Sequence, residues 1–96
     1  MVDWETRYVH APDVLAREIA GEVILVPIRE SVGDLEQIYT LNETAAWIWG
    51  LLDGTRTLAE VHEAMVAEFE VEDEQAGTDL LALVEELSEL GVIRTA

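Results

Sequence analysis

The spacing of apolar residues changes once along this 96-residue chain, from a strand period to a helix period. Between residues 14 and 41 the apolar residues alternate with polar ones or form short β-branched runs. Between residues 43 and 90 they recur every three or four positions. A period of two is typical of strands and a period of 3.6 is typical of helices. Strands followed by helices predict an α+β domain.

The strand half is expected to contain a hairpin and a third strand. Residues 14–20 and 23–28 are the two hairpin strands, and Gly21-Glu22 between them is a turn signal. After a longer loop, residues 35–41 alternate again, so that every second side chain faces the same side. These segments predict a three-stranded antiparallel sheet.

Two helices are marked by local capping signals. The first is expected over residues 43–53, between Asn42 as its N-cap and Gly54 after its end. The second is expected to begin after Thr57, because Thr57 and Glu60 have the spacing of a capping box. Both helices carry an apolar stripe and are expected to pack on the sheet or on each other.

A third and longer helix is expected to be capped by Asp73, or by Glu72, and to run to about Leu90, with Gly91 as its stop. Val92 and Ile93 are expected to fold back as a short apolar tail. Residues 1–13 have no clean period, and we predict an arm that docks on the domain or on a neighbouring copy, which would permit a homodimer. The domain proper is then residues 14–96, a three-stranded antiparallel sheet followed by three helices, with the general look of a winged helix.

The charge of the chain argues against several partners. Five arginines, no lysine and 21 acidic residues give a net charge of −16, and no lysine or arginine occurs from residue 57 to residue 93. Binding to phosphate backbones or to anionic membranes needs a basic surface, so neither nucleic acid nor a membrane is an expected partner. A third helix without lysine or arginine also disfavours a DNA-binding winged helix. The acidic surface is either solvation or salt adaptation, or a face for a basic partner.

The sequence offers no constellation for catalysis, a metal or a cofactor. Cysteine is absent, the two histidines (His10 and His62) are not paired, and there is no glycine-rich phosphate loop. Residues 68–74 are acidic but lack the order of a calcium loop. No apolar run approaches the roughly 20 residues that cross a bilayer, and no signal-peptide pattern is present. We therefore expect a cytoplasmic protein that is not an enzyme.

The edge of the predicted sheet is the remaining functional candidate. Residues 35–41 contain neither proline nor lysine, and Glu36 is their only charge, so this strand is poorly protected if it lies at an edge. A free edge accepts an added strand from a peptide. Alternatively, residues 1–13 or a second copy of the chain cover this edge.

Residues 41–57 resemble the signature of the PqqD family. They contain a Leu-Asn pair, an Ile-Trp pair, the run Leu-Leu-Asp-Gly and a following Arg-Thr, and the similarity covers residues 14–93. PqqD-like domains, also called RiPP recognition elements, are peptide-binding modules of ribosomal peptide natural-product pathways, among them pyrroloquinoline quinone biosynthesis. The resemblance implies a peptide chaperone that binds the leader of a precursor peptide. It also implies a modifying enzyme, such as a radical-SAM maturase, to which the leader is presented.

The resemblance further implies where the leader binds. In the family the leader adds as a strand beside the third strand and packs against the third helix. The residues that carry over are Leu35, Glu36, Gln37, Ile38, Tyr39, Thr40, Leu41, Asp79, Leu80, Leu83, Val84 and Leu87. Periodicity alone does not decide which of the helix residues face a peptide and which face the core. A regulatory or structural adaptor with the same fold and no peptide substrate is the alternative function.

Overall fold

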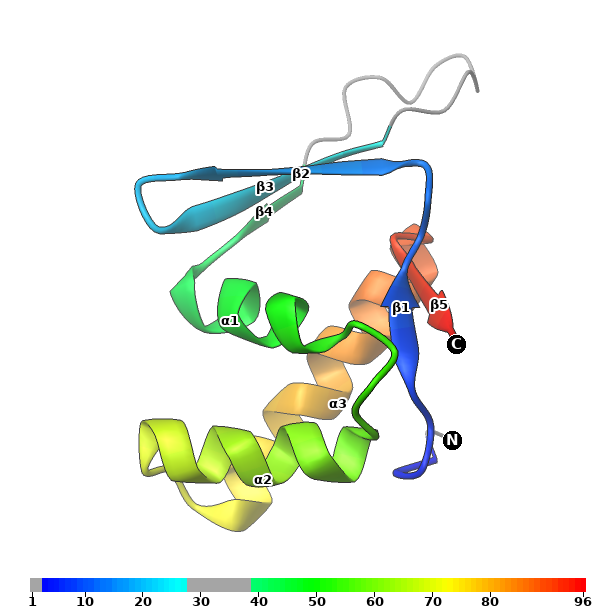
Figure 1. Cartoon of the computed structure of the whole chain (residues 1–96). Helices are drawn as coiled ribbons and strands as arrows, with labels where there is room; N and C mark the ends of the chain where they lie inside the picture. Colours follow the sequence, from blue (N-terminus) through cyan, green and yellow to red (C-terminus); the bar gives the residue numbers. More distant parts are fainter. Residues whose placement is uncertain (1–2, 28–38) are drawn as a thin grey trace.

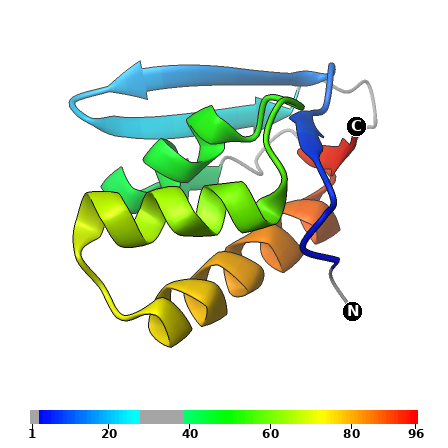
Figure 2. The same cartoon turned by 60° about the horizontal axis from the view of Figure 1, so that its bottom comes forward.

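The computed structural model describes residues 3–27 and 39–96, and in it a three-stranded sheet lies on one side of the helices (Figure 1). In chain order the elements are β1 (Tyr8–His10), β2 (Val14–Ile19), β3 (Glu22–Pro27), β4 (Tyr39–Leu41), α1 (Glu43–Leu51), α2 (Leu58–Phe69), α3 (Asp73–Leu90) and β5 (Ile93–Thr95). The antiparallel sheet β2-β3-β4 covers α1, and α2 and α3 lie beyond it (Figure 2). The predicted α+β class, a three-stranded antiparallel sheet with three helices, is confirmed.

The hairpin turns one residue earlier than the sequence predicted. The pairing of β2 with β3 ends at Ile19 and Glu22, so the turn residues are Ala20 and Gly21. Both have positive φ angles, 54° and 85°, which is the pattern of a two-residue type I′ turn. The prediction of Gly21-Glu22 was wrong because alanine is not a residue from which a left-handed conformation is expected.

One face of the three-stranded sheet builds the core. Leu25 of β3 and Leu41 of β4 lie on this face, and both side chains are fully buried. The opposite face stays open, because Leu15 and Ile19 of β2 are about half exposed, 46% and 55%. The buried leucines therefore fix which face of the sheet packs against the helices.

The two ends of the chain form a second, two-stranded sheet. β1 pairs antiparallel with β5, from Tyr8 opposite Thr95 to His10 opposite Ile93. Residues 8–10 of the predicted arm thus pair with the C-terminal strand of the same chain, and the expected apolar tail continues as that strand (Figure 1). Three-residue strands are too short to show a period in sequence, so neither strand was predicted.

The helix starts follow the capping signals. The Asn42 side chain accepts a hydrogen bond of 2.8 Å from the Ala45 N–H. The Thr57 hydroxyl accepts from the Glu60 N–H at 3.2 Å, and the Glu60 carboxylate accepts from the Thr57 N–H at 2.8 Å, which completes the predicted capping box. This second bond favours the ionised carboxylate and holds the pKa of Glu60 below its ordinary value.

Removal of the capping hydroxyl gives a measurable loss of stability. We expect Thr57→Ala to lower the free energy of unfolding by about 1 kcal/mol, because the first turn of α2 loses its side-chain acceptor. Urea unfolding followed by circular dichroism measures the change. Thr78→Ala, at an exposed position of α3, is the matched control and should stay within about 0.5 kcal/mol of the wild type. Equal losses in the two variants would contradict a capping role for Thr57.

Candidate binding groove

β4 lies at an edge of the described sheet. The strand order is β2-β3-β4, so in residues 3–27 and 39–96 no strand pairs with the far side of β4. An unpaired edge offers backbone donors and acceptors to an added strand. The first four residues of the predicted docking strand, Leu35, Glu36, Gln37 and Ile38, lie outside the described residues.

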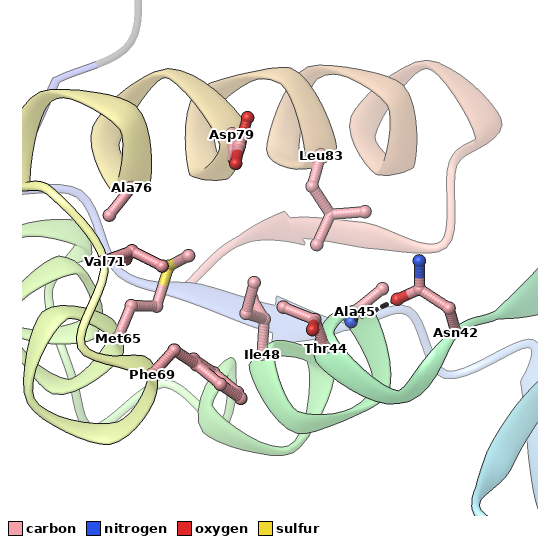
Figure 3. Close-up of a pocket in the computed structure, with 10 residues that line it drawn as sticks. All are labelled: Asn42, Thr44, Ala45, Ile48, Met65, Phe69, Val71, Ala76, Asp79 and Leu83. Carbon is pink, nitrogen blue, oxygen red and sulfur yellow. Dashed lines mark hydrogen bonds between the residues drawn. The ribbon is translucent and has the colours of Figure 1, made fainter.

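A cavity of about 490 Å³ opens where β4 ends, between α1 and α3. Figure 3 shows Leu83 of α3 directed towards Ala45 and Ile48 of α1 across this space. The lining residues are Asn42, Thr44, Ala45, Ile48, Met65, Phe69, Val71, Ala76, Asp79 and Leu83. Most of these side chains are apolar, and binding pockets commonly have volumes of roughly 300–1,000 Å³. The cavity can therefore accept apolar side chains from a ligand.

The structure separates the predicted residues of α3 into two faces. Leu80, Val84 and Leu87 have no exposed surface and belong to the hydrophobic core. Asp79 is exposed and Leu83 is half-buried, and both line the cavity. Residues four apart lie on one side of a helix, so Asp79 and Leu83 form one stripe. Leu80 and Val84, each one position further along the chain, form the neighbouring stripe with Leu87. In this conformation only Asp79 and Leu83, of these five, are within reach of a ligand.

The predicted residues of β4 also differ in accessibility. Leu41 is buried in the core, Thr40 is exposed and Tyr39 is half-buried. The Tyr39 hydroxyl donates a hydrogen bond to the Glu86 carboxylate of α3. Burial of the phenol, together with this hydrogen bond and the negative charge of Glu86, raises the pKa of Tyr39 above its ordinary value. Tyr39 therefore remains protonated and remains a donor at neutral pH.

Glu86 joins the edge strand to α3 and was not among the binding residues predicted from the sequence. Its position gave a usable signal, because Asp79, Leu83 and Glu86 are spaced i, i+4, i+7 and share one helix face. The candidate groove is defined here as the β4 edge, the Tyr39–Glu86 pair and the cavity beside them.

The described part of the chain contains neither a metal cluster nor a membrane helix. No group of three or more histidine, aspartate or glutamate side chains in residues 3–27 and 39–96 is placed to hold a metal ion. None of the described helices combines the length and the apolar character needed to span a bilayer.

The family model of coenzyme PQQ synthesis protein D (PqqD) matches residues 22–93. The chain belongs to the PqqD family. This PqqD-family chain is similar in structure to a lasso peptide synthetase B1 complexed with its leader peptide, with a TM-score of 0.77 and 27% identity over 92% of this chain and 98% of that chain. It is also similar to TbiB1 in complex with the TbiA(beta) leader peptide, with a TM-score of 0.76 and 21% identity over 90% of this chain and 94% of that chain. A search of curated proteins finds no match.

The PqqD-family match includes the whole candidate groove. Residues 22–93 contain β3, β4 and all three helices, whereas β1 and β2 precede them. Three residues of the sequence signature serve the fold. Trp49 and Leu52 are buried in the core, and Gly54 has a φ angle of 86°. The signature of this PqqD-family chain thus lies beside the groove and supports the fold around it.

Proposed function

We propose that this chain binds the leader segment of a ribosomally made precursor peptide and presents it to a modifying enzyme. The observation that carries the proposal is the unpaired edge of β4 beside an apolar cavity, in a chain of the PqqD family. Two proteins of similar structure are complexed with leader peptides, which supports leader binding by this chain.

In this proposal the leader pairs with β4 through its backbone and packs against α3. Backbone hydrogen bonds provide affinity with little demand on sequence, and side-chain pockets provide specificity. Residues 35–41 supply the backbone groups, and Leu83 with Asp79 contacts the leader side chains. Leu80, Val84 and Leu87 act indirectly, because they hold α3 in place from the core.

The chemistry belongs to the partner enzyme in this proposal. The chain acts in the cytoplasm, where precursor peptides are made, and its own role is to hold the leader while a maturase, of the radical-SAM class or another class, modifies the remainder of the peptide. A binding module of this kind needs an edge and a pocket but no catalytic group. The described side chains of the groove include a single phenol, an amide, a hydroxyl and carboxylates, without a nucleophile–base pair.

Filling the cavity is the direct test of this function. We expect the wild-type chain to bind a fluorescently labelled precursor peptide, taken from the genes that surround its own, and Thr44→Trp to weaken this binding about tenfold or more, because an indole at the cavity excludes an apolar anchor. Thr44 is exposed, so the larger side chain should not disturb the core. Fluorescence anisotropy with the partner enzyme present measures the affinity.

Thr78→Trp is the matched control, since Thr78 is exposed on α3 and does not line this cavity. The control should bind like the wild type. Equal weakening by both variants would place the peptide elsewhere on the chain. Absence of saturable wild-type binding at tens of micromolar would reject the proposal and favour an adaptor without a peptide substrate.

A further inference from the structure

One face of α3 presents an acid, an apolar residue and a second acid in that order. Asp79, Leu83 and Glu86 stack on this face, and the two acids are separated by two helical turns, a rise of about 10.5 Å. Asp79 and Leu83 line the cavity (Figure 3), and Glu86 accepts the hydrogen bond of Tyr39 from β4. This face of α3 therefore extends from the cavity to the side chain of Tyr39 in the edge strand.

Neither acid has a basic partner within the described residues. Asp79 accepts a hydrogen bond of 2.9 Å from the neutral Gln75 amide, and Glu86 accepts from the neutral Tyr39 hydroxyl. The arginine ion pair found in that part of the chain joins Arg56 to Asp53, away from the groove. A basic side chain from a ligand would therefore gain a charged partner here without breaking an existing ion pair.

The spacing of these residues fits an extended peptide. Side chains on one face of a strand recur about every 6.6 Å, so the residues two before and two after a central residue lie about 13 Å apart. The long stems of lysine and arginine accommodate the difference from the 10.5 Å between the acids. We propose that the groove selects a leader segment of the form basic-x-apolar-x-basic, with the apolar side chain against Leu83 and the basic ones at Asp79 and Glu86. This inference rests on the proposed function.

The apolar and charged contacts contribute differently in this proposal. The apolar anchor fills the cavity and supplies most of the affinity. The two charge pairs lie at the rim, where each changes affinity by about two- to fivefold at low salt. Their larger effect is on choice of peptide, because a leader with acidic flanks would bring like charges together beside α3.

Selection from a random peptide display library tests this preference directly. The library is panned on the wild type, on Asp79→Asn/Glu86→Gln, and on the control Glu85→Gln/Glu89→Gln. Glu85 and Glu89 are exposed on α3 outside the cavity, so the control changes the net charge equally. Glutamine at position 86 retains an acceptor for the Tyr39 hydroxyl. Peptides are assigned to the groove when Thr44→Trp weakens their binding.

We expect the wild type and the control to enrich basic-x-apolar-x-basic peptides in the groove, and the Asp79/Glu86 variant to lose that preference. Individual peptides should bind this variant about 4- to 25-fold more weakly at low salt, with a smaller difference at high salt. Groove peptides without basic residues would overturn this inference and leave the proposed function intact. If both double variants lost the preference equally, net charge alone would explain the preference, and this result would also overturn the inference. Failure to enrich any groove peptide would contradict the proposed function itself.

Discussion

Replacement of Leu80 by alanine should lower the free energy of unfolding by about 2–5 kcal/mol without a specific effect on peptide affinity. Leu80 has no exposed surface and packs in the core between α3 and its neighbours. The smaller side chain loses buried apolar contacts and leaves a cavity that the surrounding residues fill only in part. Small domains are stable by roughly 5–15 kcal/mol, so this loss is a large share of the total. Urea unfolding measures the stability, and anisotropy at low temperature measures the affinity of the folded fraction.

Leu83→Ala is the counterpart on the other face of the same helix. Leu83 is half-buried and lines the cavity, so we expect a smaller loss of stability, about 1 kcal/mol, and a clear loss of peptide affinity. If Leu80→Ala leaves too little folded protein, Leu80→Met retains most of the volume and should cost less than about 1.5 kcal/mol. A loss of affinity in folded Leu80 variants equal to that in Leu83→Ala would contradict the assignment of the two faces.

The helices were predictable from the sequence because their signals are local. The third helix ends at Leu90 as predicted, and its N-cap is Glu72, the second of the two caps that the sequence left open. The capping box of Thr57 and Glu60 specifies the start of α2 within four residues of sequence, and both of its hydrogen bonds form. The first helix ends at Leu51, two residues before the predicted end, because Leu52 leaves helical geometry before Gly54 is reached. Capping chemistry thus fixed the starts of α1 and α2 better than apolar periodicity fixed the end of α1.

Features that depend on distant parts of the chain were less predictable. β1 and β5 are three residues long and pair across almost the whole sequence, so neither has a local signature. The buried and exposed faces of α3 are adjacent stripes, and periodicity does not say which stripe meets the core. Glu86 acquires its position in the groove only through Tyr39, which comes from another element. The role of residues 35–41 in binding remains a prediction, and residues 35–38 lie outside the described part of the chain.

Alanine at position 54 should cost about 2–5 kcal/mol of folding free energy. Gly54 has a φ angle of 86°, a left-handed conformation that costs an L-residue about 1–2 kcal/mol. A Cβ atom at this position would also lie only 2.7 Å from Cγ1 of Val9 in β1, and overpacking of this kind costs roughly 1–3 kcal/mol. Gly50→Ala is the matched control, because a Cβ at Gly50 meets nothing within 4 Å and alanine favours a helix by about 0.5–1 kcal/mol.

The double variant Val9→Ala/Gly54→Ala separates the two contributions to this cost. Alanine at position 9 removes Cγ1 and therefore the crowding, whereas the strain of the positive φ angle remains. The double variant should thus be more stable than the sum of the single losses predicts, by about 1–3 kcal/mol. Additive losses would show that the contact with β1 is not the reason for glycine. We expect unchanged peptide affinity in folded Gly54→Ala, because Gly54 only packs the connection between α1 and α2 against β1. A specific loss of affinity would instead assign this part of the family signature to the binding site.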